Sequence, residues 1–490
     1  MHRIPGKLLF YLLFLALLGL ALGLIAGVSM QSSWISTLCL LFSVVCAASI
    51  ALIAIRNYHT LLLYINQLFV VGLIFLFVVI INFFGCKISS SFDSRWSIHT
   101  TMSMIKEGNI DLDEYQPLIE EEQYYAIYRI EDHLYTMYPI GTSFLAIPYV
   151  FAMDTFYKRS LGIVLEQFIG ESFPRGLEIF IASNIIAFAT VLIYLMGNLF
   201  FEKRRYSLLL AWIFTFCTSA WSTASRALWP HGPSALMLAL ALYLFLLAER
   251  HPHHSRYLIP LMGLPLAFSF VIRPTNSLSI LGLTLIIIRQ CRKYVSAYCV
   301  WSLLVAIPFV AFNLQLYHAV LPPYYTASSQ LHISREMLEG LVGTLISPSR
   351  GLFIFTPVLL FSVYGIVLKI RHKQMKAFDY ALLGILTLHW TFSSAHPHWW
   401  GGHSYGPRYF TDVLPYFLYF LIPAMMHIST STGLRRTVFI TGFIGLLALS
   451  FVIHFRGATN WDVHYWNTVP VNVDDYPERV WDWRDMQFLR

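Results

Sequence analysis

The acidic residue best placed for chemistry is Asp93, in the FDSRW segment of a long polar stretch between apolar runs. Apolar residues at helical spacing follow it and Gly108 ends the pattern, which predicts a helix over 94–107. Asp93 has two compatible interpretations. It could cap this helix by accepting hydrogen bonds from backbone N–H groups, or it could act as a general base that takes a proton from a hydroxyl group.

Two other acidic pairs in this stretch have structural explanations beside the chemical one. Glu131 and Asp132 separate two aromatic, partly alternating runs, which predicts a small hairpin with Asp132 at its turn. Both stay as further candidates for the base. Asp111 and Asp113 have the DxD spacing of a metal site, but more acids and a proline follow them, which favours a solvated acidic loop. We expect no metal site, and a divalent cation stays open as a cofactor.

Basic residues near predicted helix ends form the second candidate set. Four arginines stand beside proline, glycine or aromatic residues: Arg226, Arg273, Arg350 and Arg408. One such arginine usually extends to the lipid headgroups. Four on one side of a membrane are more typical of anion binding, because a guanidinium group makes paired contacts with phosphate oxygens.

Histidines accompany these arginines. His396, His398 and His403 could suggest zinc, but His-Pro-His lacks the i, i+4 spacing of ligands on one helix and no cysteine is near. We therefore expect no zinc. The other candidates from these segments are His231, His403 and Tyr405.

The elements that must position these residues are membrane helices. The chain has 490 residues, of which 57% are hydrophobic and 12% charged, whereas a soluble domain carries about 25% charge. A span needs about 20 apolar residues, and these runs are apolar all round without the alternation of a barrel strand. We predict an all-α polytopic protein with about thirteen spans: 8–30, 34–55, 60–84, 177–200, 206–224, 232–249, 257–272, 276–289, 295–314, 352–369, 377–394, 409–427 and 436–455.

The connectors between the spans predict the topology. Short basic connectors alternate with long acidic ones, and all but three of the 26 acidic residues fall in the acidic set; the exceptions are Glu202, Glu249 and Asp379. Lys and Arg in short loops mark the cytoplasmic side, so the N-terminus is expected inside and the C-terminus outside. The apolar segment 142–156 is short and contains Pro148, and we expect it to be an interfacial helix that continues over 161–168.

These patterns indicate a single membrane domain over 1–490. Its outer parts are the loop 85–176, a second loop 315–351, and a tryptophan-rich tail 456–490 that should fold against the loops. The net charge of +7 is spread as single residues between apolar runs, which excludes a nucleic-acid-binding surface. The six cysteines follow neither disulfide nor metal spacing.

At these residues the chain resembles a known group of enzymes, the GT-C superfamily of membrane glycosyltransferases. It is most similar to the bacterial branch near protein O-mannosyltransferases and the lipid A aminoarabinose transferase. The matching segments are FDSRW, GNIDLDEY and YPIGTSFLAIP, and later PSRGLFIFTPVLL and WWGGHSYGPRYFTDVLP. The strongest similarity covers about 85–150, and the rest agrees in span layout and short motifs.

The resemblance implies a polyprenyl-phosphate sugar donor, used on the outer face of the cytoplasmic membrane. Asp93 then takes the position of the catalytic base, and basic groups hold the lipid phosphate. Arg95 matches the basic residue that follows the acid in this family and joins Arg226, Arg273, Arg350 and Arg408 as a candidate for binding the donor phosphate. The chain departs from the family at the exit of the loop, where Tyr138 stands before Pro139 in place of a lysine. It also has Ser94 after the acid, where the protein mannosyltransferases have Asp-Glu.

We therefore predict an inverting transfer of the sugar to a hydroxyl group on a glycan, lipid or protein acceptor. Two other classes stay open. A secondary transporter would carry charged residues inside its spans, and these spans have almost none. An O-antigen polymerase or ligase would depend on a large late loop with arginines, whereas the large loop here is early and acidic.

Overall fold

A computed structural model describes residues 58–490, except 87–90, 92, 123–124, 172–173 and 328–334. The chain divides into two compact units, Met1–Ile74 and Phe75–Arg490, and the second holds every candidate residue. The predicted spans 8–30 and 34–55 lie outside the described residues.

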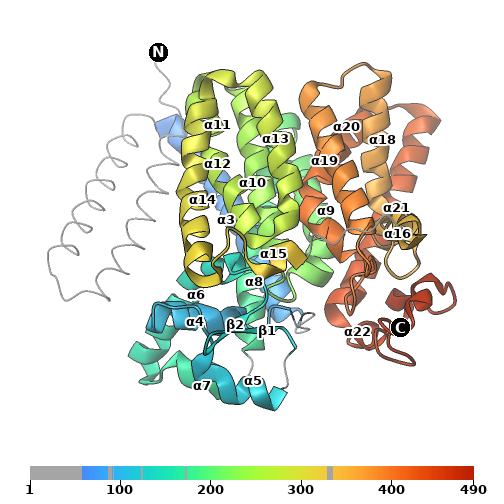
Figure 1. The fold of residues 1–490 in the computed structure, drawn as a ribbon. Helices are drawn as coiled ribbons and strands as arrows, with labels where there is room; N and C mark the ends of the chain where they lie inside the picture. The colour runs from blue at the N-terminus through green and yellow to red at the C-terminus, as the bar shows by residue number, and fades with distance from the viewer. Residues whose placement is uncertain (1–57, 87–90, 92, 123–124, 172–173, 328–334) are drawn as a thin grey trace. The chain divides into compact units, whose positions relative to one another are not determined.

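Every other predicted span coincides with one helix or a short series of helices. They are α3 (Tyr58–Phe84), α8 (Arg175–Phe200), α9 (Arg204–Phe216), α10 (His231–Arg250), α11 (Ser255–Leu261), α12 (Gly263–Ile272), α13 (Ser277–Gln290), α14 (Val295–Tyr317), α17 (Leu352–Phe355), α18 (Leu360–Arg371), α19 (Ala377–Ser394), α20 (Leu414–Thr430) and α21 (Gly433–Thr459). In the unit 75–490, α10 packs against α8 and α12, and α13 packs against α19 (Figure 1).

Seven helical segments among the described residues are long and apolar enough to cross a membrane. They are 66–84, 175–200, 231–250, 252–272, 292–317, 408–430 and 433–459. Large apolar side chains on α14 and α21 are exposed, which suits contact with lipid. The protein is thus an all-α, multi-pass membrane protein, while the count of thirteen spans stays a prediction.

The first polar loop folds into short elements. These are α4 (Ser97–Lys106), a 3₁₀ turn (Asp113–Tyr115), α5 (Gln116–Glu122), the strands β1 (Ile127–Ile130) and β2 (His133–Thr136), α6 (Gly141–Leu161) and α7 (Leu165–Glu171). The two strands are antiparallel, with Ile127 paired to Thr136, which confirms the predicted hairpin. Helix α6 packs on α4 and is not among the helices that are both long and apolar enough to cross a membrane, in agreement with the prediction that 142–156 is not a span.

The later polar segments are also short. They comprise a π-helical turn (Ala220–Ala224), α15 (Pro323–Ala327), α16 (Arg335–Ile346), the 3₁₀ helix η7 (Arg408–Val413) that leads into α20, and α22 (Asp462–Tyr465). The remaining 3₁₀ turns are Pro252–His254, Pro274–Asn276, Arg292–Tyr294, Pro357–Leu359, Pro477–Trp481 and Gln487–Leu489. Figure 1 shows α4, α5, α7 and the hairpin gathered beyond the ends of the long helices.

Candidate active site

Asp93 does not cap a helix, so the cap interpretation is wrong. Helix α4 begins at Ser97 with Trp96 at its N-cap position, and no side chain among the described residues caps it. Asp93 lies in the turn that precedes Trp96. Its carboxylate is therefore available for contacts with other parts of the chain.

Three side chains from distant segments contact the Asp93 carboxylate. Its Oδ1 accepts hydrogen bonds from the hydroxyl groups of Tyr138, at 3.0 Å, and Tyr125, at 3.2 Å. Its Oδ2 lies 3.3 Å from Nη1 of Arg408. The side chains of Arg408 and Asp93 are 15% and 22% exposed, so this ion pair is largely shielded from water.

The hairpin explains why two tyrosines meet at Asp93. Tyr125 comes shortly before β1 and Tyr138 shortly after β2, and strand pairing brings the open ends of the hairpin together. Their hydroxyl oxygens lie 3.0 Å apart. Burial and the charge of Asp93 raise the pKa of the Tyr125 hydroxyl. It therefore keeps its proton at neutral pH and can donate to the carboxylate.

Aromatic rings and a glycine hold Arg408 in place. Its guanidinium carbon lies 4.6 Å from the ring centre of Trp229 and 5.3 Å from that of Tyr409. Gly401, with φ +75°, lies against the Arg408 side chain, where an added Cβ would be 3.0 Å from Nε. The Nε–H group is buried, and no acceptor contacts it within the described parts of the chain. Arg408 thus has an unused donor in a pre-organised position.

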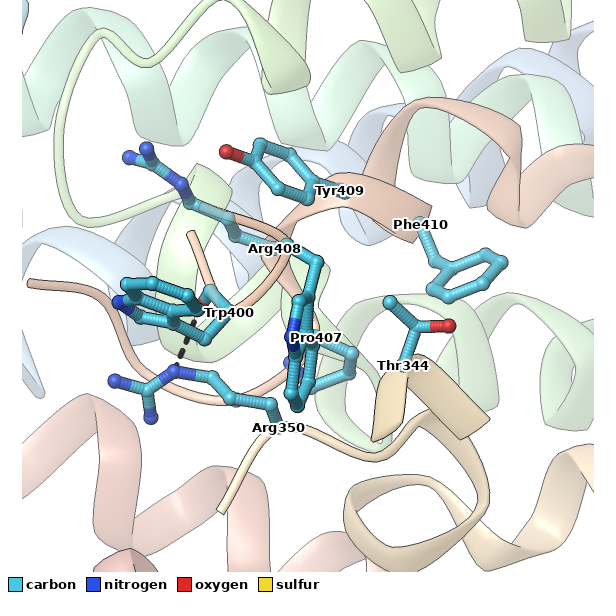
Figure 2. Close-up of a pocket in the computed structure, with 9 residues that line it drawn as sticks. Thr344, Arg350, Trp400, Pro407, Arg408, Tyr409 and Phe410 are labelled. Carbon is cyan, nitrogen blue, oxygen red and sulfur yellow. Dashed lines mark hydrogen bonds between the residues drawn. The ribbon is translucent and has the colours of Figure 1, made fainter. Parts of the chain in front are cut away.

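A small pocket adjoins this arginine. Its lining includes Arg350, Trp400, Pro407, Arg408 and Tyr409. Figure 2 shows the side chain of Arg408 extending beside the Tyr409 ring, whereas the guanidinium of Arg350 turns to the Trp400 carbonyl. The two arginines that line the pocket therefore have different surroundings.

Arg350 is bound by the chain itself. It is buried, and its three nitrogens donate to the Trp400, Ser349 and Gly402 carbonyls and to the side chains of Gln487 and Asn467. Burial lowers its pKa to about 9, with a contribution from the Arg408 charge. These contacts occupy its nitrogens and assign it a structural part in holding the tail.

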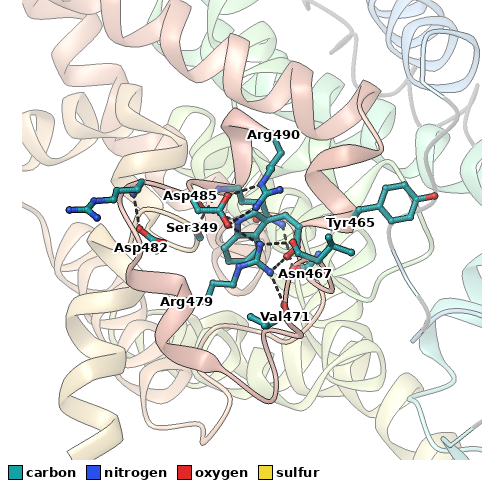
Figure 3. Close-up of polar contacts among 12 residues, drawn as sticks. Ser349, Tyr465, Asn467, Val471, Arg479, Asp482, Asp485 and Arg490 are labelled. Carbon is teal, nitrogen blue, oxygen red and sulfur yellow. Dashed lines mark hydrogen bonds and ion pairs between the residues drawn. The ribbon is translucent and has the colours of Figure 1, made fainter.

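The tail contains a second arginine of this kind. The guanidinium carbon of Arg479 lies 4.2 Å from the ring centre of Trp466. Arg479 also donates hydrogen bonds to the Val469 and Val471 carbonyls and to the Asp485 carboxylate (Figure 3). Several buried residues of the tail pack with Trp399 and Trp400, so the tail folds against the loop between α19 and α20.

Arg226 is likewise buried among backbone acceptors. It is 0% exposed and donates to the carbonyls of Asn82 and Cys86, at the end of α3, and to the Ser225 hydroxyl. It therefore joins the segment 225–231 to the start of the loop that carries Asp93.

Glu178 makes a second connection between the same two segments. It is fully buried on α8, and its Oε1 accepts from the Ser94 hydroxyl and from the Leu228 N–H group at 2.9 Å. Ser94 follows Asp93, and Leu228 precedes Trp229, whose ring lies against Arg408. Helix α8 therefore fixes the distance between the segment that carries Asp93 and the segment that carries Trp229.

Arg273 and His231 lie together in a third group. Asp412, which is 0% exposed, contacts Nδ1 of His231 through Oδ1 and Nη1 of Arg273 through Oδ2, each at 2.6 Å. The guanidinium carbon of Arg273 is 5.6 Å from the Tyr409 ring centre. Arg273 and Arg408 therefore both lie against one tyrosine ring.

Tyr324, on α15, lies among the charged groups of the site. Its ring centre is 5.7 Å from that of Tyr138. Burial raises the pKa of its hydroxyl, on which the charges of Arg273, Asp93 and Arg408 also act. Its position brings the loop that contains α15 to the same place as the first polar loop.

The remaining predicted residues lie elsewhere. Glu131 and Asp132 form the exposed turn of the hairpin, with Glu131 at φ +54°. His403 lies 2.7 Å from Asn472 on the tail. Tyr405 is buried, and its hydroxyl donates to the Ile453 carbonyl. Arg95 is half-buried, and its charge acts on the Glu178 carboxyl group.

One group of acidic residues could hold a cation. Oxygen and nitrogen atoms of Asp111, Asp113 and His133 lie within 4.8 Å of one another, and a second group combines Asp111 with Glu107 and Glu114. However, Asp113 accepts from the Leu134 N–H group at 2.8 Å and contacts His133, so it also holds the hairpin in place. These contacts support a structural part for Asp113.

Sequence reasoning missed several members of the site. Tyr125 stands in an aromatic run that resembles any exposed strand, and Glu178 and Asp412 lie at the ends of apolar runs. No local spacing indicates the partners of Asp412, because His231 and Arg273 lie 181 and 139 residues away in the chain. Tyr324 had no local signal.

Comparison with known proteins gives no family assignment. No protein-family model matches the chain, and no curated protein matches it in sequence.

Proposed function

We propose that this chain is an inverting glycosyltransferase of GT-C type. It moves a sugar from a polyprenyl-phosphate donor to an acceptor hydroxyl group. The observation that carries the proposal is the meeting of the Asp93 carboxylate with Arg408, which has a buried, unused Nε–H donor beside aromatic rings. A base and an anion-binding group lie in one place on a protein built for a membrane.

The reaction divides between these two groups. Asp93 takes the proton of the acceptor hydroxyl as that oxygen forms a bond to the anomeric carbon. The bond from this carbon to the phosphate oxygen breaks, and polyprenyl phosphate leaves with the electron pair. Arg408 stabilises the charge that develops on the phosphate, and each charge-assisted hydrogen bond contributes about 1.5–3 kcal/mol.

The membrane placement follows the pattern of charged connectors. We assign the chain to the cytoplasmic membrane, with its N-terminus inside and the catalytic loop and tail on the periplasmic or extracellular face. Cysteines introduced at Lys203 and at Glu120 should react with impermeant reagents from opposite faces. Labelling of both from one face would contradict this assignment.

The decisive experiment is donor consumption by the purified protein in lipid nanodiscs. A panel of polyprenyl-phosphate-linked sugars is supplied with candidate glycan, lipid and peptide acceptors, and free polyprenyl phosphate is measured by mass spectrometry. We expect release from at least one donor, dependent on an acceptor. Absence of release and of polyprenyl phosphate binding across the panel would refute the proposal. Movement of a solute without donor consumption would indicate a transporter.

A further inference from the structure

Asp412 is a buried carboxylate at the meeting point of three helix ends. It belongs to η7, contacts His231 at the start of α10, and contacts Arg273 immediately after α12. A carboxylate without water is stable only when it is paired, and here one oxygen faces each partner. Asp412 therefore determines where the Arg273 side chain lies.

The network opens toward the proposed donor site. The Asp412 side chain is 0% exposed, whereas that of Arg273 is 13% exposed. The Arg273 guanidinium lies against Tyr409, the ring that also contacts Arg408. The charges of both arginines act on the Tyr324 hydroxyl. The two guanidinium groups therefore both lie near the Tyr409 ring and the Tyr324 hydroxyl.

We infer that Asp412 is a positioning residue for the donor phosphate, because it holds Arg273 beside Arg408 so that one phosphate group meets both arginines. This inference rests on the proposed function and adds the second phosphate-binding side chain. Among the residues that the structure describes, no acceptor contacts the Nε–H group of Arg408, which leaves this donor for the anion. Nη1 of Arg273 contacts the Asp412 carboxylate, and the guanidinium group of Arg273 lies against the Tyr409 ring.

The contacts of His231 add a reason for Arg273 to shift toward an anion. Its Nδ1 lies 2.6 Å from both Asp412 Oδ1 and Arg273 Nη1. A ring nitrogen carries either a proton or a lone pair, so it can satisfy only one of these two neighbours. When a phosphate accepts the hydrogen bond from Arg273, the Nη1–H group of Arg273 no longer competes at Nδ1 of His231. The Nδ1–H group of His231 can then donate to Asp412 alone.

The test is a double-mutant cycle on binding of a short-chain polyprenyl phosphate, without sugar, to the full-length protein in nanodiscs. Arg273→Gln and Asp412→Asn should each weaken binding about ten-fold, the loss of one charge-assisted contact. The double variant should bind no more weakly than Arg273→Gln alone, because Asp412 acts through Arg273. Arg484→Gln, which removes an exposed arginine of the tail, serves as the charge control and should bind normally.

The outcomes separate this inference from the proposed function. If the wild-type protein does not bind polyprenyl phosphate, the proposed function fails and the inference fails with it. If the wild type binds polyprenyl phosphate and both single variants bind it as tightly as the wild type does, only the inference is overturned. Independent, multiplying losses would also overturn it, since they indicate a general structural effect. If Asp412→Asn does not fold, Arg273→Lys is measured in its place, because lysine keeps the positive charge toward Asp412 but lacks the guanidinium group. Binding by Arg273→Lys that is no better than binding by Arg273→Gln supports the need for a positioned guanidinium group. Binding by Arg273→Gln at the wild-type level refutes the inference.

Discussion

Replacement of Asp93 by asparagine separates the proposed catalytic part of this residue from its structural contacts. The amide has the size of the carboxylate, and its oxygen can still accept from the Tyr125 and Tyr138 hydroxyls. Because Asp93 caps no helix among the described residues, the substitution does not disturb α4. What it removes is the negative charge beside Arg408 and the ability to take a proton.

The two losses differ in size. The ion pair is long, at 3.3 Å, and its side chains are only 15% and 22% exposed, so it contributes about 1.5 kcal/mol, the low end for a hydrogen bond between charged groups. If Asp93 were only the partner of Arg408, transfer would therefore fall by no more than about ten-fold. Loss of a general base lowers the rate by about 10²–10⁴, which corresponds to about 2.7–5.4 kcal/mol of activation free energy.

The affinity for polyprenyl phosphate is a second, independent measurement on the Asp93→Asn variant. The neutral amide in the Asp93→Asn variant no longer holds Arg408 by charge and no longer repels an incoming anion. Polyprenyl phosphate should therefore bind this variant at least as tightly as the wild type. The assay pairs single-turnover release of polyprenyl phosphate from a sugar donor with equilibrium binding of polyprenyl phosphate. Near-normal turnover would refute the base assignment. A rate loss matched by an equal loss of affinity would show that Asp93 acts in binding.

Three further substitutions test the surroundings of the site. Tyr138→Phe removes the shorter hydroxyl contact to the carboxylate and should slow transfer about ten-fold with normal donor binding, measured by the same release assay. Gly401→Ala should weaken polyprenyl phosphate binding several-fold, because the new Cβ would lie 3.0 Å from Nε of Arg408. Gln487→Ala removes an acceptor of the buried Arg350 and should lower the free energy of unfolding by about 1–3 kcal/mol, seen as a lower melting temperature.

The glycine substitution has a matched control in the neighbouring residue. Gly402→Ala matches Gly401→Ala, since this residue also has positive φ but its added Cβ would meet only Asp474, at 3.6 Å. Equal binding losses in the two alanine variants would contradict the argument from contact with the arginine. An unchanged melting temperature for Gln487→Ala would show that the tail contributes little to stability, and normal transfer by Tyr138→Phe would remove that hydroxyl from the mechanism.

The sequence alone determined the helices and the hairpin, because these depend on neighbouring residues. Apolar runs of membrane length form helices wherever they occur, since backbone groups must bond within the segment in the absence of water. The alternation around Glu131 and Asp132 likewise specifies a hairpin locally. Asp93 was recognised from its local surroundings, but the helix expected to begin at Ser94 begins at Ser97.

Only the tertiary structure distinguished the arginines from one another. Arg226, Arg273, Arg350 and Arg408 share a local pattern of proline, glycine and aromatic neighbours. Their surroundings depend on residues far along the chain: backbone carbonyls occupy Arg226, the tail occupies Arg350, and Arg408 meets a carboxylate 315 residues away. Whether a guanidinium group is used up or open to an anion depends on which distant acceptors the packing brings to it, and no local pattern records those contacts.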